Sequence, residues 1–321
     1  MNILVTGITG FFGTALLKYL YSSGYAGAIF GISRNPLALD NLRAKFHGFD
    51  SVELFCCDIF DGDVLCNLLK LNDISHIFHF AADSTNGPEM KLMARYCQIV
   101  DGTRAVLDSA VQCGVKNVLL ASSGAVYTSS ENLTTSLPFS EEQILSPSFD
   151  ISGPSIYRMA KINSEYLSKI YSSEKGLNIR VARCFSFVGE DLPLDKHFAI
   201  GNFLNDSLNS REIVVNGSGL DVRSYMYQED LAKWLMVIGT HEMSGWNTYN
   251  VGSNFPITLG DLAELIKSVS KNDKPVVTLG NKSQKTNFYV PNTDKAALEL
   301  GLLTQYDLIH ALEETIARLK F

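Results

Sequence analysis

The sequence predicts an α/β fold in which a doubly wound parallel sheet is joined to a smaller C-terminal α/β domain. Three observations lead to this prediction. The chain opens with a strand, a glycine-punctuated turn and a helix; strand and helix patterns then alternate to about residue 185; and that alternation stops after Gly189. Strands that alternate with helices imply right-handed crossovers and a parallel sheet. Such sheets bind ligands at the carboxyl ends of their strands.

The first twenty residues are the most informative stretch. An apolar run at residues 2–6 leads into Gly7-Ile8-Thr9-Gly10-Phe11-Phe12-Gly13, and a helical pattern follows at once. Gly7 can adopt a tight turn, Gly10 lets main chain approach a pyrophosphate, and Gly13 lets helix and strand pack closely. The helix N-terminus would direct its amides at the phosphates. The spacing Gly-x-x-Gly-x-x-Gly also occurs at ordinary strand-to-helix turns, but its place at the start of the chain favours a dinucleotide site.

The remaining elements of the first part follow from hydrophobic periodicity and turn residues. Strands are expected at 28–33, 52–56, 77–80, 118–121 and 179–184. Helices are expected at 61–71, 88–113 and 155–173. Residues 128–153 are rich in Ser, Thr and Pro and predict a loop with one helical turn at most.

The second part has no phosphate loop and does not repeat the first. Helices are expected at 198–210 and 229–238, strands at 213–215 and 249–251, and a glycine-rich turn at 216–219. Thr258 with Asp261, and Thr304 with Asp307, have the spacing of helix-capping pairs and predict helices directly after them. A smaller domain that covers the substrate is the simplest interpretation.

Composition excludes several classes of function. The 321 residues are 46% hydrophobic and 19% charged, with a net charge of −7, which argues against a protein that binds nucleic acid. A local basic pocket for a small phosphorylated ligand is still compatible with this charge. No apolar run approaches the ~20 residues of a membrane span, and the N-terminus has no signal-peptide pattern. A soluble, cytoplasmic protein is therefore expected.

Cysteine and histidine spacing predicts neither disulfides nor a metal site. None of the six cysteines forms a Cys-x-x-Cys pair, and most lie in apolar runs, as buried thiols do. The six histidines lack the spacing of metal ligands.

Tyr157 and Lys161 are the strongest chemical signal after the glycines. At i and i+4 on a helix, the phenol and the ammonium lie on one face. A free tyrosine has a pKa of about 10, so it needs a nearby cation to act as an acid or base at neutral pH. A Tyr-x-x-x-Lys pair alone is usually structural. Here it follows a strand that ends in Ser122-Ser123, where a hydroxyl could hold a substrate oxygen while Tyr157 transfers a proton.

These motifs, in this order, resemble the extended short-chain dehydrogenase/reductase family, in particular its nucleotide-sugar epimerases, dehydratases and 4-ketoreductases. The resemblance covers nearly the whole chain and rests on residues 7–13, 57–59, 79–82, 122–127, 157–161, 183–186 and 223–225. It implies a Rossmann domain over residues 1–185, with returning segments near 224–251, and a nucleotide-sugar-binding domain over 186–321. It also implies a homodimer in which helices 88–113 and 155–173 form a four-helix bundle.

The resemblance assigns roles to individual residues. The catalytic residues it implies are Ser123, Tyr157 and Lys161. The cofactor-binding residues it implies are Gly7, Thr9, Gly10, Phe11, Phe12, Gly13, Ser33, Arg34, Asp58, Ile59, Phe80, Ala81, Ala82, Ala121, Tyr157 and Lys161. The substrate-binding residues it implies are Ser84, Ser123, Ser186, His197, Asn202, Val215 and Arg223. Arg223 could instead form a surface salt bridge, and His197 could simply be exposed.

Departures from the family pattern narrow the reaction. Members that prefer NAD end the second strand with Asp, whereas this chain has Ser33-Arg34, which would bind a 2′-phosphate and so favours NADP(H). Dehydratases carry an acid pair after the catalytic hydroxyl, and here those positions are Gly124 and Ala125. Ser186, Glu190 and Ile99 also differ from the usual residues, which weakens the substrate assignment.

An NADPH enzyme without elimination residues most simply transfers one hydride. The stretch 183–203 further resembles bacterial 4-ketoreductases that complete deoxyhexoses for surface polysaccharides such as O-antigen. The expected reaction is the reduction of dTDP-4-keto-6-deoxyglucose to dTDP-fucose, with a CDP-linked 4-keto sugar next. A nucleotide-sugar 4-epimerase is the alternative. A non-catalytic dinucleotide sensor is less favoured because the chain keeps both Tyr157 and Lys161.

Overall fold

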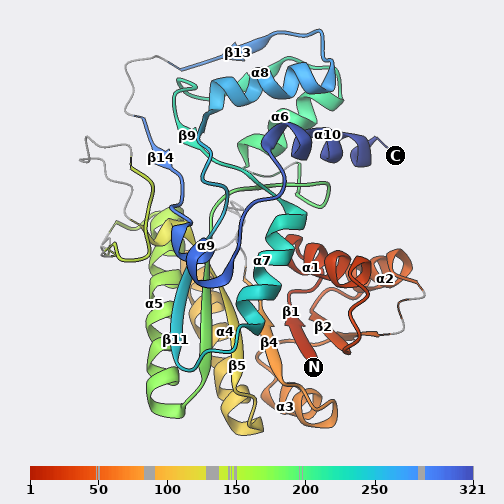
Figure 1. Cartoon of the computed structure of the whole chain (residues 1–321), viewed down its shortest axis with the longest axis vertical. Coiled ribbons are helices and arrows are strands. Elements are labelled where there is room, and N and C mark those ends of the chain that lie inside the picture. The colour runs from red at the N-terminus through yellow and green to blue at the C-terminus, as the bar shows by residue number, and fades with distance from the viewer. Residues whose placement is uncertain are drawn as a thin grey trace. The chain divides into compact units, whose positions relative to one another are not determined.

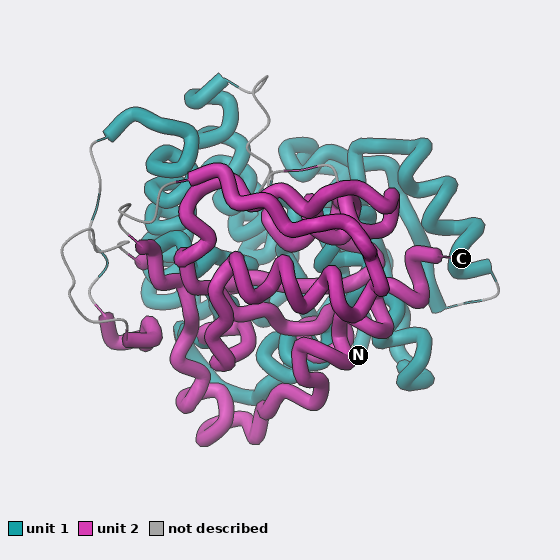
Figure 2. Tube along the Cα trace, turned by 90° about the horizontal axis from the view of Figure 1, so that it is seen from above, with its two compact units in different colours: residues 1–126, 145–183, 232–249 teal, residues 127–144, 184–231, 250–321 magenta. Residues whose placement is uncertain are grey.

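The computed structural model describes residues 1–47, 49, 51–82, 91–127, 137–143, 145, 147, 150–194, 196, 198–280 and 286–320. Contacts within the chain divide it into two compact units, coloured separately in Figure 2. Unit 1 comprises Met1–Val126, Leu145–Arg183 and Ala232–Tyr249, and unit 2 comprises Tyr127–Ile144, Cys184–Leu231 and Asn250–Phe321. The chain therefore passes between the two units several times.

Unit 1 is built on a parallel sheet. Within the described part of the chain this sheet has seven strands in the order β11-β6-β5-β4-β1-β2-β3 (Figure 1). The strands are β1 (Ile3–Thr6), β2 (Ile29–Ser33), β3 (Val52–Cys56), β4 (His76–His79), β5 (Asn117–Ser123), β6 (Asn178–Cys184) and β11 (Trp246–Val251). The strand order reverses between β1 and β4, and ligands bind α/β sheets at such a switch point. The doubly wound parallel sheet predicted from the sequence is confirmed.

The helices of unit 1 flank this sheet. They are α1 (Phe11–Ser22), α2 (Pro36–Lys45), α3 (Gly62–Leu71), α4 (Leu92–Cys113), α5 (Gly153–Lys175), most of α7 (Gln228–Thr240) and the short 3-10 helix η1 (Gly124–Val126). Helices α4 and α5 lie side by side, and Thr103 Oγ1 of α4 donates a hydrogen bond of 3.2 Å to Ser164 Oγ of α5 (Figure 1). The face that α5 buries is rich in serine, and these small side chains let the two helices approach closely.

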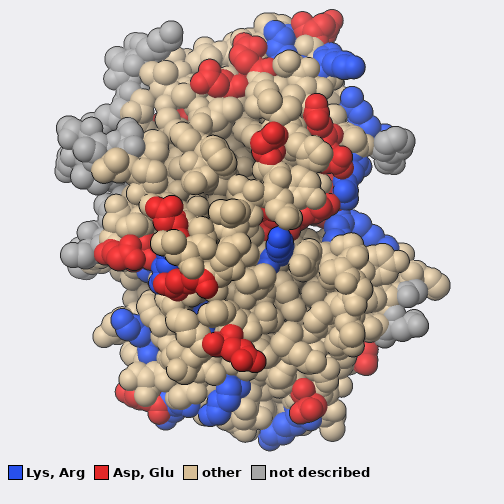
Figure 3. Space-filling view, in the orientation of Figure 1, with Lys and Arg blue, Asp and Glu red and all other residues tan. Residues whose placement is uncertain are grey.

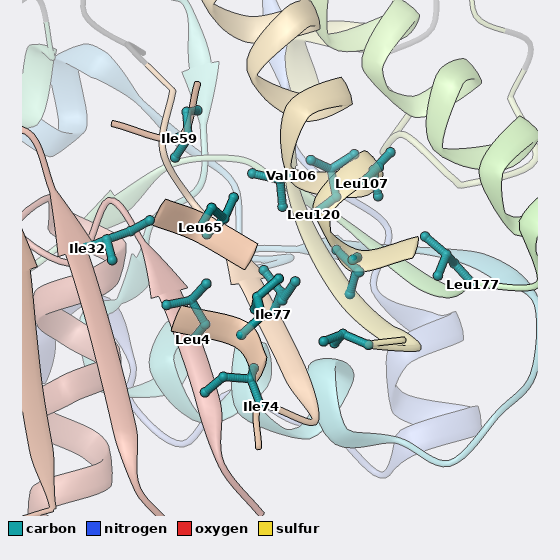
Figure 4. Packing of buried hydrophobic residues seen from close by; sticks show 14 of the residues in the cluster. Leu4, Ile32, Ile59, Leu65, Ile74, Ile77, Val106, Leu107, Leu120 and Leu177 are labelled. Carbon is teal, nitrogen blue, oxygen red and sulfur yellow. The ribbon is translucent and has the colours of Figure 1, made fainter. Parts of the chain in front are cut away.

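Branched side chains from the sheet and from α3 and α4 form the core on one face of unit 1. Leu4, Ile77 and Leu120 of adjacent strands point toward Leu65 of α3 and Val106 of α4 (Figure 4). Each of these side chains is at most 3% exposed, so each contributes about 1.5–3 kcal/mol of burial free energy. This packing holds in place the strand ends that carry the candidate site.

Unit 2 contains shorter strands and several helices. Its elements are β7 (Phe187–Val188), α6 (Ala199–Leu208), β8 (Ile213–Val215), β9 (Val222–Arg223), β10 (Met226–Tyr227), β12 (Ile257–Thr258), α8 (Leu259–Ser270), β13 (Val276–Thr278), β14 (Phe288–Tyr289), α9 (Asp294–Leu300) and α10 (Leu308–Leu319). Small sheets form from β10 with β7, from β12, β9 and β14, and from β13 with β8.

One predicted helix cap is confirmed and the other is wrong. Thr258 caps α8, and its Oγ1 accepts a hydrogen bond of 3.0 Å from the Asp261 N–H. Thr304 does not cap α10; Asp307 does, and its carboxylate accepts from the His310 N–H at 2.8 Å. The cause lies outside the local sequence. The Gln305 and Tyr306 amides donate to the buried Asp230 carboxylate, which holds these residues outside the helix.

The surface of the molecule carries charged side chains of both signs (Figure 3). Acidic and basic side chains are interspersed over most of the face in Figure 3. Among the described helices, none is both long enough and apolar enough to cross a membrane.

All six cysteines are free thiols, and Cys57, Cys66 and Cys184 are buried. The described His, Cys, Asp and Glu side chains form no group that could hold a metal ion.

Candidate active site

The glycine turn after β1 has the shape that a dinucleotide requires. Gly7 has a φ of 71°, and a Cβ there would lie 2.9 Å from the Ala81 nitrogen. A Cβ at Gly13 would lie 2.5 Å from both Cα and O of Ile8, so only glycine fits at this helix–strand contact. The turn therefore depends on glycine at both positions, for conformation at one and for space at both.

The N-terminus of α1 presents main-chain amides without a side-chain cap. Gly10 is the N-cap residue and has no side chain that could accept from these N–H groups. Uncapped amides and the helix dipole favour an anion at this position. Phe12, in the first turn, packs edge-on against Phe80 with ring centroids 5.9 Å apart. Phe11 lies next to Phe12, with centroids 5.9 Å apart.

A cavity of about 590 Å³ opens beside the glycine turn in unit 1. Its lining residues are Gly7, Ile32, Ser33, Arg34, Asn35, Cys57, Ile59, Phe60, Ala81, Ala82 and Gln98. Six of these were predicted as cofactor-binding residues; Ile32, Asn35, Cys57, Phe60 and Gln98 were not. The volume lies in the range of small-molecule and cofactor sites. Within the described part of the chain, the buried Gln98 Oε1 has no hydrogen-bond partner.

Polar groups gather at one end of this cavity, where β2 meets α2. Thr9 Oγ1 and Ser33 Oγ are 2.9 Å apart, and the Asn35 N–H donates to Ser33 Oγ at 3.3 Å. The Arg34 guanidinium is 59% exposed and lies 3.9 Å from the Asp58 carboxylate. An exposed ion pair of this length contributes about 0–1 kcal/mol to stability. The Arg34 guanidinium can therefore leave Asp58 and bind another anion at little cost. Two hydroxyls and a guanidinium suit a phosphate monoester.

Ser123, Tyr157 and Lys161 all belong to unit 1. Ser123 ends β5 and is buried, and its Oγ accepts a hydrogen bond of 3.1 Å from the Ala125 N–H. The buried Lys161 Nζ donates to the Ala121 carbonyl at 2.7 Å and lies 5.9 Å from the centroid of the Tyr157 ring. The ammonium is thus fixed to the strand that carries Ser123 and lies within reach of the phenol ring.

Sequence reasoning missed a second cation at this ring. The Arg95 guanidinium carbon, from the first turn of α4, lies 4.9 Å from the centroid of the Tyr157 ring. Arg95 is only 4% exposed. Its spacing of i, i+4 and i+8 with Ile99 and Thr103 places it on the buried face of α4, and this signal is visible in the sequence.

A buried ion pair connects the elements that carry the predicted catalytic residues. Glu165, one turn after Lys161 on α5, accepts from Arg183 Nη2 of β6 at 2.8 Å and from Ser122 Oγ of β5 at 2.5 Å. Ser122 and the two charged residues are each at most 4% exposed. Ser122 directly precedes Ser123, so this network fixes α5 relative to the end of β5. The role of Glu165 was not predicted, although its i+4 spacing from Lys161 is a signal for it.

His79, at the end of β4, is buried and uncharged. Burial, with the positive charge of Lys161 as a smaller cause, lowers the pKa of His79 to about 3. Thr6 Oγ1 lies 2.8 Å from His79 Nδ1 and accepts a hydrogen bond of 3.1 Å from the Ala81 N–H, so this hydroxyl links the imidazole to the backbone that follows β4. The charge that His79 would otherwise add beside Lys161 is therefore absent.

The predicted substrate residues in unit 2 have different surroundings. Ser186 and Asn202 are half-buried, and the Val215 side chain is buried completely. Arg223 Nη1 donates to the Val222 and Asn287 carbonyls at 2.8 and 3.1 Å, and the guanidinium lies over the Tyr289 ring at 5.6 Å. Arg223 Nη2 also lies 3.7 Å from the Asp221 carboxylate, so the salt bridge considered from the sequence is present and Arg223 is held in place. Ser84 and His197 lie outside the described residues.

A match to the model of a known protein family shows which family the chain belongs to. The model of the "NAD dependent epimerase/dehydratase family" matches residues 3–252 of the chain, which include the glycine turn, Ser123, Tyr157, Lys161 and Arg223. The chain belongs to this family. It is therefore an enzyme of the nucleotide-sugar epimerase/dehydratase type.

The individual relatives have low sequence identity to this chain. The chain is 26% identical over 307 residues to UDP-glucuronic acid decarboxylase 6 of Arabidopsis thaliana, covering 94% of this chain and 83% of that protein. It is also 26% identical to a dTDP-glucose 4,6-dehydratase of Streptomyces antibioticus, covering 98% of this chain and 91% of that protein.

Among solved structures, the UDP-glucose 4-epimerase of Thermotoga maritima, crystallised with UDP-glucose, matches with a TM-score of 0.85 at 22% identity. That match covers 100% of this chain and 99% of the epimerase. This similarity shows that the fold is shared.

Proposed function

We propose that this enzyme uses NADPH to reduce the C4 ketone of a nucleotide-linked 4-keto-6-deoxyhexose. The favoured substrate is dTDP-4-keto-6-deoxyglucose, which would give dTDP-fucose for a surface polysaccharide, and a CDP-linked 4-keto sugar is next. The observation that carries this proposal is the polar group at the end of β2, where Ser33 and Arg34 stand in place of a carboxylate. An enzyme that consumes NADPH reduces its substrate once and does not take the hydride back.

The residues around the cavity fit a dinucleotide with a 2′-phosphate. The glycine turn and the uncapped amides of α1 suit the pyrophosphate, and Ser33 and Arg34 line the same cavity. A carboxylate at position 33 would repel a 2′-phosphate, whereas a hydroxyl and a guanidinium can both donate to it. The family description names NAD, so the proposed preference for NADP(H) rests on Ser33 and Arg34.

The reaction needs a proton donor and a hydrogen-bond donor at the C4 oxygen. The reduced nicotinamide, when bound, supplies the hydride. Tyr157 gives its phenolic proton to the oxygen as negative charge develops there, and Ser123 Oγ donates a hydrogen bond to the same atom. Lys161, fixed to the Ala121 carbonyl, stabilises the phenolate that remains. We expect Tyr157→Phe to bind NADPH with unchanged affinity and to lose turnover, which fluorescence titration and a rate assay measure separately.

The residues after Ser123 support reduction over elimination. Gly124 and Ala125 form the start of η1, and neither carries an acid or a base. Removal of water from the sugar needs both a proton donor and a proton acceptor close to the reacting carbons. We therefore expect no conversion of dTDP-glucose, the substrate named for the Streptomyces relative.

A nucleotide-sugar 4-epimerase is the second candidate, and the likeness to the Thermotoga maritima epimerase favours it. An epimerase returns the hydride to its substrate, so it shows no net oxidation of NADPH. The same side chains would serve that reaction, because Tyr157 would then act alternately as base and acid.

The proposal also concerns the residue that binds the sugar diphosphate and the oligomeric state. Arg223 is the candidate contact for the sugar diphosphate, because a guanidinium pairs well with phosphate oxygens. We also propose a homodimer through α4 and α5, whose outer faces expose Met93 and Tyr166 at 73% and 68%.

An assay with a panel of sugars tests the proposed function. Oxidation of NADPH is followed with dTDP-, CDP-, UDP- and GDP-linked 4-keto-6-deoxy sugars, and the products are identified by NMR. We expect one equivalent of NADPH consumed for each sugar reduced, with the dTDP sugar fastest. Interconversion of two sugars without consumption of NADPH would establish the epimerase instead.

A further inference from the structure

A buried arginine lies against the tyrosine that transfers the proton. Arg95 is on the buried face of α4, and its guanidinium carbon is 4.9 Å from the centroid of the Tyr157 ring. Arg95 is 4% exposed, so its guanidinium is largely withdrawn from water beside this ring. Contact with an aromatic face is one favourable environment for it.

The ring gains more from this contact when it is ionised. A phenolate spreads its negative charge over the ring, so a cation near the ring face stabilises the phenolate more than the neutral phenol. Lys161 Nζ lies 5.9 Å from the same centroid. Two cations from two different helices, Arg95 of α4 and Lys161 of α5, therefore favour the same ionised form.

We propose that Arg95 is a positioning residue that acts through Tyr157, as a second cation that makes the phenol more acidic. The proposal rests on the proposed function only in that it takes Tyr157 as the group that transfers the proton. It concerns residues of unit 1 alone and is independent of which sugar is bound.

Two other ionisable residues, Asp150 and Arg158, lie close to Tyr157 in the sequence. Arg158 follows Tyr157 in the chain and adds positive charge to the same helix. Asp150 precedes the helix, and its carboxylate accepts hydrogen bonds from Ser152 Oγ at 2.8 Å and Ser155 Oγ at 3.1 Å. Two hydroxyls at the N-terminus of α5 thus bind this carboxylate.

Ionisable groups of the neighbouring strands also add little net charge. His79 of β4 is neutral at physiological pH, as its lowered pKa requires. Glu165 of α5 is paired with Arg183 of β6 at 2.8 Å, so that pair has no net charge. Within the described structure, Lys161 and Arg95 are the cations within 6 Å of the centroid of the Tyr157 ring.

The expected effect is a shift in the pH at which Tyr157 ionises. A unit charge at this distance lowers the pKa of an acid by about 1–3 units, and a cation beside the ring rather than at the oxygen belongs at the low end. We therefore expect Arg95→Met to raise the pH of ionisation by about one unit. Reduction needs the protonated phenol, so its decline at alkaline pH should move upward by the same amount.

Tyrosine labelled with ¹³C at Cζ gives a direct measurement in the enzyme without substrate. The Tyr157 resonance is assigned by its loss in Tyr157→Phe, and its chemical shift is followed by NMR as the pH rises. Arg95→Met removes the charge at similar length, and Arg95→Lys restores the charge without the guanidinium. Arg104→Met is the matched control, because Arg104 is 59% exposed on the same helix and pairs with Asp101 at 3.2 Å.

The proposal predicts an upward shift of about one pH unit in Arg95→Met, partial recovery in Arg95→Lys and no shift in Arg104→Met. A Tyr157 resonance that titrates at the wild-type pH in folded Arg95→Met would overturn it. Since no substrate is present, this result does not depend on the sugar assay. A panel in which no sugar is reduced would remove the proposed function but not the titration result.

Discussion

Replacing Glu165 with Gln is the sharpest test of how the site is held together. The substitution keeps the shape of the side chain but removes its charge, and it leaves Arg183 buried without a carboxylate. Both partners are about 5% exposed or less, and the closest N–O distance is 2.8 Å. Removing one partner of a buried ion pair typically costs about 3–5 kcal/mol.

That free energy should appear as a large change in melting temperature. For a cooperative unit of roughly 150–250 residues, each kcal/mol shifts Tm by about 2–4 °C, so Glu165→Gln should melt roughly 6–20 °C lower. Ser122→Ala removes only the hydrogen bond to the carboxylate and should cost about 1.5–3 kcal/mol. The double variant Glu165→Leu with Arg183→Met removes both charges and should regain much of the lost stability.

Calorimetry of these variants measures the stability effect, and a rate assay well below the lowest Tm measures the effect on the site. Because the network fixes α5 relative to Ser123, we expect Glu165→Gln to lower kcat by about ten- to a hundredfold. A Glu165→Gln protein that melts within about 2 °C of wild type would refute this reasoning. A double variant that is less stable than Glu165→Leu or Arg183→Met alone would also refute this reasoning.

Three further predictions follow from the same structure. Arg34→Met should lower kcat/KM for NADPH by about 10- to 100-fold and leave NADH unaffected, because it removes a charge-assisted contact to the 2′-phosphate; equal losses with both cofactors would contradict this. Because the pKa of His79 falls from 6.5 to about 3 on folding, the unfolded state binds the extra proton, so the free energy of unfolding should fall as the pH drops from about 6.5 towards 3. The slope from this residue is at most about 1.4 kcal/mol per pH unit, and urea titrations at several pH values should show it flattened in His79→Gln. Light scattering should give twice the chain mass of 35.4 kDa, and Tyr166→Glu, at an exposed position of α5, should give the monomer mass.

The fold was largely predictable because its determinants are local. Apolar runs bounded by turn residues predicted β3 (Val52–Cys56) and β8 (Ile213–Val215) at their observed bounds. Helix α2 was not predicted, because Asn35-Pro36 directly after the second strand is also a typical turn sequence. In the structure Asn35 caps the helix by accepting from the Ala38 N–H at 3.1 Å, and Pro36 occupies the first helical position.

Other elements could not be predicted from the local sequence. Strands of two residues such as β9 and β12 form only by pairing with distant parts of the chain. Val222 and Arg223 of β9 pair with Thr258 and Ile257 of β12 on one side and with Phe288 and Tyr289 of β14 on the other. The helix cap at Asp307 depends on Asp230, which binds the preceding amides from another part of unit 2. Such tertiary contacts override local capping signals.

The candidate site likewise has one part that the sequence predicts and one part that depends on tertiary contacts. Glycines at defined spacing and a Tyr-x-x-x-Lys pair are sequence motifs, and the structure brings Tyr157 and Lys161 onto one helix beside the end of β5. The contact of Arg95 with Tyr157 and the pairing of Glu165 with Arg183 join distant elements. Sequence periodicity places Arg95 and Glu165 on buried helix faces but does not say which groups they meet.

Transfer of deuterium from NADPH labelled at the hydride position is the most direct test of the central claim. With dTDP-4-keto-6-deoxyglucose as substrate, we expect one deuterium bonded to C4 of the product for each NADPH oxidised, as read by NMR. An unlabelled product at C4, or a converted sugar with the NADPH still reduced, would contradict the assignment as a ketoreductase.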